Sequence, residues 1–203
     1  MESTGKDIFS TWKRSIKKVI DNGSAVPTER QGDAQELLNY QICISSPLHN
    51  IDNVVAFDKR RGIYYDTVAN QKYWATVEER LMRFISRNGD VNQIEAIQDR
   101  LKKYAYNRQA YATIWSPEED TVSTSPYCIL GIYFFIREGC LNMTALMRSN
   151  DAWGQALNDI YHLVHIQKKV AEMIEIPIGA YTHYVTSYHI YISDLVNAKK
   201  FIE

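Results

Sequence analysis

The sequence has few cysteines and lacks a long apolar run. Its three cysteines, Cys43, Cys128 and Cys140, are far apart and form no CxxC pair of the kind that binds metals or carries out redox exchange. No stretch has the length and apolar character of a membrane span, and the first 18 residues lack a signal-peptide core. We therefore expect a protein of the reducing cytoplasm that does not bind membranes.

The chain also lacks an excess of basic charge. It has 23 Lys and Arg against 24 Asp and Glu, a net charge of -1, which argues against a protein whose main task is to coat nucleic acid. A nucleotide pocket stays possible, because it needs only a few local arginines. With 203 residues, of which 45% are apolar and 23% charged, the chain is typical of one soluble domain over residues 1–203.

Apolar spacing predicts both helices and strands, without an internal repeat. Helices are predicted over residues 7–21, 74–87, 91–104 and 153–176, the first two ended by Asn-Gly pairs. Strands are predicted over residues 36–45, 108–115, 127–136, 140–147 and 180–192, with a hairpin turn at Glu138-Gly139 and irregular structure up to about residue 70. Because the strands cluster in the second half beside long helices, the pattern favours an α+β fold.

Three short segments contain residues with useful chemistry. Cys128 begins a predicted strand, where a lone cysteine is most often a buried core residue. Arg148 and Ser149 combine a planar guanidinium fork with a hydroxyl, which suits a phosphate, although such a pair is commonly a polar strand end. His189 and Tyr191 share one face of a predicted strand and are suited to a sugar hydroxyl, or else they form a satisfied edge of the core.

Together these segments resemble the motifs of the thymidylate synthase family. Arg148 to Asp151 resembles the RSxD segment, His189 to Tyr191 resembles the HxY motif, and the stretch from Gln93 to Trp115 resembles the segment that holds a phosphate-binding arginine pair. Arg108, Cys128 and Arg148 are each twenty residues apart, so the order and spacing of the motifs agree as well. The resemblance is strongest over residues 91–193 and looser over residues 30–87.

The resemblance implies a thymidylate synthase-type fold, a mixed β-sheet with flanking helices, in a homodimer whose sheets pack back to back and share active sites. It implies that a cysteine thiolate, here Cys128, adds to C6 of a pyrimidine nucleoside monophosphate. C5 then becomes nucleophilic and takes a one-carbon unit from 5,10-methylenetetrahydrofolate. Covalent catalysis of this kind divides one difficult substitution into easier steps.

Further roles follow from the resemblance alone. The residues that would bind phosphate are Arg148, Ser149, Arg30 on a loop, and Arg108, which would act in the site of the neighbouring subunit. The family has a second arginine after the one that matches Arg108, and this chain has Gln109 there. His189 and Tyr191 would contact the ribose, and Asp151 the pterin. The catalytic glutamate would be Glu79, although strict alignment of the helix places Arg80 at that position.

The position that reads the base separates the possible substrates. Alignment without a gap places Asp159 where thymidylate synthases have asparagine, and a shift of one residue would place Asn158 there instead. A carboxyl group accepts a hydrogen bond from the cytosine amine, whereas an amide matches uracil. In having an acid at this position the chain resembles the deoxycytidylate and cytidylate 5-hydroxymethylases of the superfamily, and this resemblance favours 5-hydroxymethylation of CMP or dCMP. The alternatives are a thymidylate synthase acting on dUMP and a nucleotide-binding protein without folate chemistry.

Overall fold

The computed structural model, which describes residues 1–29, 32–61 and 68–203, contains a mixed β-sheet. Its strands are β1 (Glu2–Gly5), β2 (Ser24–Val26), β3 (Ala34–Ile44), β6 (Tyr111–Thr113), β7 (Ile129–Arg137), β8 (Cys140–Asp151) and β9 (Ile178–Tyr191). They lie in the order β1-β3-β9-β8-β7-β6, and β2 pairs with β3 off this path. The pairs β1–β3 and β8–β9 are parallel and the other pairs are antiparallel.

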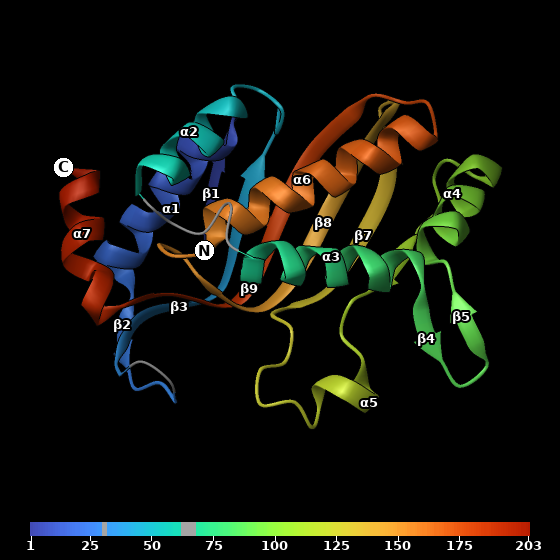
Figure 1. The fold of residues 1–203 in the computed structure, drawn as a ribbon. Helices are drawn as coiled ribbons and strands as arrows, with labels where there is room; N and C mark the ends of the chain where they lie inside the picture. Colours follow the sequence, from blue (N-terminus) through green and yellow to red (C-terminus); the bar gives the residue numbers. More distant parts are fainter. Residues whose placement is uncertain (30–31, 62–67) are drawn as a thin grey trace.

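Helices flank this sheet, and several of them cover one of its faces (Figure 1). The helices of the described residues are α1 (Ile8–Asn22), α2 (Asp52–Arg61), α3 (Val68–Met82), α4 (Gln93–Lys103), α5 (Pro117–Asp120), α6 (Ala156–Met173) and α7 (Ile192–Ile202). Figure 1 shows α1, α2, α3 and α6 over the same face, with α6 crossing the middle of the sheet. None of the helices formed by the described residues is both long and apolar enough to cross a bilayer.

The predicted fold class is confirmed, because the chain combines a mixed sheet with flanking helices. The predicted hairpin between β7 and β8 is also confirmed. Its turn residues, Glu138 and Gly139, have φ values of 53° and 72°, as a two-residue turn with a left-handed backbone requires. The helix predicted over residues 7–21 is α1, and Asp7 caps its first turn by accepting a hydrogen bond from the Ser10 amide.

Other predicted boundaries are wrong. Residues 52–61, expected to be irregular, form α2, whose few apolar positions, including the buried Val54, gave too weak a periodicity to detect. The second predicted helix begins earlier, at Val68, and ends at Met82. The residues after it form the strands β4 (Phe84–Ser86) and β5 (Gly89–Val91). Gly89, with a φ of 106°, helps to close this hairpin instead of ending a helix.

An aromatic cluster joins α1 to the segment that follows β8. Trp12 is fully buried on α1, and its ring lies 6.2 Å from that of Trp153 and 5.4 Å from that of Phe201 on α7. The indole Nε1 of Trp12 donates a hydrogen bond of 2.7 Å to the carbonyl oxygen of Ala152. This bond fixes the chain immediately after the RSxD-like segment, so the cluster supports the site as well as the core.

We predict that Trp12→Phe lowers the free energy of unfolding by about 1–3 kcal/mol, because it leaves the buried Ala152 carbonyl without its donor. Urea unfolding followed by circular dichroism measures the change. Lys17→Ala on the same helix is the control. It removes only an exposed ion pair with Asp21, so its effect should stay within about 0.5 kcal/mol. Equal effects of the two substitutions would contradict the assigned role of the indole.

Candidate functional site

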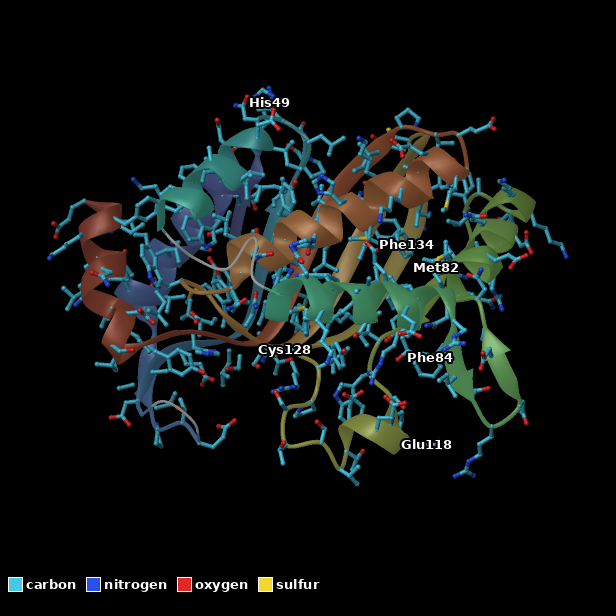
Figure 2. All side chains as sticks on the ribbon, in the orientation of Figure 1. His49, Met82, Phe84, Glu118, Cys128 and Phe134 are labelled. Carbon is cyan, nitrogen blue, oxygen red and sulfur yellow. The ribbon has the colours of Figure 1, made fainter. Side chains whose placement is uncertain are left out.

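Cys128 lies immediately before β7, at the lower edge of the sheet in Figure 2. The β7–β8 hairpin places the cysteine beside β8, where the Arg148 amide donates a hydrogen bond of 2.9 Å to the Cys128 carbonyl. The Sγ atom of Cys128 is 3.7 Å from the Oγ atom of Ser149, and the cysteine is half-buried. The structure therefore brings together the two motifs that the sequence separates by twenty residues.

The Arg148 guanidinium supports the segment that precedes the cysteine. Its Nε donates to the Tyr127 carbonyl at 3.0 Å and its Nη2 to the Pro126 carbonyl at 2.8 Å. Its Nη1 lies 3.3 Å from the Ser149 hydroxyl. A guanidinium has five N–H donors, so an arginine with these contacts retains donors for an anion. Arg148 thus both positions the cysteine segment and offers charge beside it.

Parallel pairing of β8 and β9 adds the third motif. Asp151 on β8 lies opposite His189 on β9, and the Ala152 amide donates to the His189 carbonyl at 2.7 Å. The rings of His189 and Tyr191 are 5.0 Å apart. Among the described residues the buried Nδ1 atom of His189 has no hydrogen-bond partner, so it is free to bind a ligand hydroxyl.

Asp151 is held by backbone amides at the end of β8. Its Oδ1 accepts hydrogen bonds from the amides of Trp153 at 3.1 Å and Gly154 at 2.9 Å. Burial raises the pKa of Asp151, while the Gly154 amide and the nearby His189 lower it. A Cβ atom added at Gly154 would lie 2.3 Å from the Oδ2 of Asp151, so this turn has no room for a side chain.

Asp159 lies in the first turn of α6 and is 8% exposed. Its Oδ2 accepts a hydrogen bond of 2.6 Å from the Nδ2 of Asn150, the residue after Ser149. Burial raises the pKa of Asp159 to about 7, against the lowering effect of the Asn150 bond. The neighbouring Asn158 is also buried, and neither polar atom of its amide has a partner among the described residues.

Sequence reasoning missed Tyr73, on α3. Its ring stacks on that of Tyr127 at 5.1 Å, immediately before Cys128 in the chain. Burial raises the pKa of its hydroxyl well above the usual value, and the charges of Asp159 and Cys128 raise it further. Tyr73 therefore packs against the segment that leads to the cysteine. The only sequence signal was its place beside Trp74 on a predicted helix.

The two candidates for the family's glutamate position have different surroundings. Glu79 is exposed on α3 and accepts a hydrogen bond from Arg83 at 3.1 Å. Arg80 instead binds Asp120 at 2.6 Å, and its guanidinium carbon lies 4.3 Å from the centre of the Tyr127 ring. The structure thus places Arg80, and not Glu79, against the segment that leads to the cysteine.

The two remaining arginines predicted to bind phosphate do not join this group within the described chain. Arg30 lies outside the described residues. Arg108 is exposed before β6, near Ala110, whose carbonyl accepts from the Phe134 amide on β7. Phe134 follows Cys128 by six strand positions, which corresponds to roughly 20 Å along the sheet. Arg108 therefore cannot reach the cysteine of its own chain.

Comparison with known proteins points to one family. A sequence model described as "Thymidylate synthase" matches residues 31–203. A protein of Methanothermobacter thermautotrophicus named "Putative thymidylate synthase" is 28% identical, over 97% of this chain and 96% of its own length. A protein of the same name from Methanocaldococcus jannaschii is 26% identical, over 91% of this chain and 88% of its own.

A bacterial relative matches a smaller part of the chain. Thymidylate synthase 1 of Bacillus spizizenii is 27% identical over 115 residues, which are 55% of this chain and 40% of the bacterial protein. The family match extends over more than four-fifths of the sequence and includes Cys128, the RSxD-like segment and the HxY-like segment. The chain therefore belongs to the thymidylate synthase family.

Proposed function

We propose that the protein transfers a one-carbon unit from methylenetetrahydrofolate to C5 of a pyrimidine nucleoside monophosphate, with 5-hydroxymethylation of CMP or dCMP as the favoured reaction. The observation that carries this choice is the buried Asp159 carboxyl, which accepts a hydrogen bond from Asn150. Asn150 directly follows Ser149, whose hydroxyl lies 3.7 Å from the sulfur of Cys128. Family membership supports the reaction class, because thymidylate synthases are folate-dependent transferases that act on pyrimidine nucleotides.

In this proposal Cys128 is the nucleophile. Its thiolate forms a bond to C6, the C5–C6 π electrons move toward C5, and C5 becomes able to attack an electrophilic carbon. The Ser149 hydroxyl, 3.7 Å from the sulfur, and the guanidinium of Arg148 are placed to hold the 5′-phosphate of the same nucleotide. His189 and Tyr191 would then contact the ribose.

The hydrogen bonds of the Asp151 carboxylate support its proposed role in binding the pterin. Its Oδ1 already accepts two backbone amides, whereas its Oδ2 makes no hydrogen bond with another described residue. A free carboxylate oxygen suits the N–H groups of a pterin ring. When bound, methylenetetrahydrofolate supplies the one-carbon unit. Loss of the C5 proton and departure of tetrahydrofolate would leave a methylene group on C5. Water would then add to this carbon to give the hydroxymethyl group, and the C6–sulfur bond would break to restore the C5–C6 double bond and release Cys128.

A homodimer with shared sites explains the position of Arg108. The long helices α1, α3 and α6 leave the opposite face of the sheet uncovered in Figure 1. Tyr111 and Tyr133 are paired on neighbouring strands of that face and are 37% and 40% exposed. Two copies packed through these faces would bury this apolar surface and bring Arg108 of each copy toward the site of the other.

One observation favours the alternative of a nucleotide-binding protein without one-carbon transfer. Glu79, the residue expected to act as the catalytic acid–base, faces solvent and binds Arg83. Tritium release from C5-labelled CMP, dCMP and dUMP in the presence of methylenetetrahydrofolate separates the three possibilities. Release from the cytosine nucleotides supports hydroxymethylation, release from dUMP supports thymidylate synthesis, and binding without release supports the third.

We predict that Cys128→Ser reduces tritium release to background while nucleotide binding is largely retained, because a hydroxyl is a far weaker nucleophile than a thiolate. Cys140→Ser is the matched control. Cys140 lies at the hairpin turn, at the opposite end of β8 from Arg148, and its replacement should leave the rate unchanged. Full release from the Cys128→Ser protein would reject the nucleophile assignment.

The shared site predicts complementation between two inactive variants. Cys128→Ser and Arg108→Ala should each be strongly impaired, but a mixed dimer has one site that combines Cys128 of one copy with Arg108 of the other. After random subunit exchange the mixture should recover about a quarter of the normal activity. No recovery in mixed dimers, verified by separate affinity tags, would show that Arg108 acts in its own chain or not at all.

We predict that Asp159→Asn shifts the preference of the protein from cytosine toward uracil nucleotides. The carboxyl accepts from the cytosine amine, whereas an amide also donates to O4 of uracil. The shift should be about 1–3 kcal/mol, the cost of one unpaired buried group. Competitive binding of CMP or dCMP against UMP or dUMP measures it, with Asn158→Ala for comparison. A larger shift from Asn158→Ala would transfer base recognition to that residue.

A further inference from the structure

A chain of buried hydrogen bonds extends from Asp159 into the sheet. Beyond Asn150, the amide Oδ1 lies 2.9 Å from the Nε2 of His183, and the Nδ1 of His183 lies 2.7 Å from the Tyr181 hydroxyl. Tyr181 and His183 on β9 are 0% exposed, and Asn150 on β8 is 3% exposed. Tyr181 and His183 lie outside the motifs that define the nucleotide site, and Asn150 takes the variable position of the RSxD-like segment. The hydrogen bonds that join these three residues end at Asp159, the residue proposed to read the base.

The donor and acceptor of each hydrogen bond in this series can be assigned by starting at Asp159. Asn150 donates from Nδ2 to the carboxyl, so its Oδ1 must accept from the Nε2–H of His183. Burial lowers the pKa of His183 to about 3, so the ring is neutral and carries one hydrogen. Its Nδ1 therefore accepts from the Tyr181 hydroxyl, and all three donors point toward Asp159.

This arrangement fixes one carboxyl oxygen and leaves the other available. Oδ2 accepts the 2.6 Å bond from Asn150, whereas Oδ1 of Asp159 makes no hydrogen bond with another described residue. If the Asn150 amide turned over, it would present its oxygen to Oδ2, and Asp159 would have to carry a proton there. The orientation of the amide therefore determines which hydrogen-bonding pattern the carboxyl offers to a base.

We propose that Asn150, His183 and Tyr181 are positioning residues that set base selectivity by holding the Asp159 carboxyl in its acceptor arrangement. The inference rests on the proposed base-reading role of Asp159. The Tyr181 hydroxyl keeps Nδ1 of the neutral His183 ring paired while Nε2–H donates to Asn150. Without that hydroxyl, Nδ1 has no partner in a fully buried site, and the ring loses one of the two hydrogen bonds that hold it against the Asn150 amide.

The test is Tyr181→Phe in the full-length protein, with competitive binding of CMP or dCMP against UMP or dUMP. We expect the cytosine-to-uracil preference to fall roughly fivefold or more, since one buried donor is lost. If the Tyr181 hydroxyl were needed only for the fold, its loss would weaken the binding of cytosine and uracil nucleotides alike and leave the ratio of their affinities unchanged. Tyr40→Phe is the control, because it also removes the hydroxyl of a fully buried tyrosine. That hydroxyl binds Ser3 and takes no part in the hydrogen bonds that lead to Asp159.

Two further measurements keep the inference testable. The side-chain amide of glutamine also has a group that can donate to Asn150 and one that can accept from Tyr181. His183→Gln should therefore preserve the cytosine-to-uracil preference. The ring nitrogens of His183, identified in NMR spectra by comparison with His183→Gln, should show the Nε2–H tautomer, and the Nδ1–H tautomer would overturn the proposal. If Asp159→Asn shifts the ratio and Tyr181→Phe does not, the inference fails while the proposed function stands. If neither shifts it, base reading by Asp159 fails as well.

Discussion

Parallel pairing between β8 and β9 is the constraint on which the rest of the site depends. Parallel neighbours cannot be joined by a tight turn, so the chain must cross over, and α6 provides that crossover. Because β8 and β9 run in the same direction, Asp151 and His189 lie side by side at the C-terminal ends of the two strands. The buried Gln167 on α6 secures the other end by donating to the carbonyls of Leu141 and Ala180.

The segment around the cysteine is held by charged side chains that already bind its backbone. Arg148 donates to the carbonyls of Pro126 and Tyr127, and Arg80 binds Asp120 and lies over the Tyr127 ring. Asp120 in turn accepts from the amides of Ser116 and Tyr127. Such bonds to charged groups contribute about 1.5–3 kcal/mol each, so this segment is held firmly in place for covalent chemistry.

Asp159 gives the site a chemistry that an asparagine could not. With a pKa raised by burial to about 7, the carboxyl is close to the balance between its protonated and ionised forms at neutral pH. An ionised carboxyl only accepts hydrogen bonds, whereas a protonated one also donates, and cytosine presents both an amine and an acceptor nitrogen. The bond from Asn150 holds one oxygen, and in the proposed function the other is the oxygen that would meet the base.

The sequence by itself determined the α+β class, the β7–β8 hairpin and the motifs around Cys128, Arg148 and His189, because these depend on local periodicity, turn residues and fixed spacing. It could not place Tyr73 against Tyr127, since α3 and the segment before β7 meet only through packing. Nor could it show that Glu79 faces solvent or that His183 and Tyr181 lead to Asp159. Side-chain direction and burial are set by contacts between distant segments, and only the tertiary structure decides them.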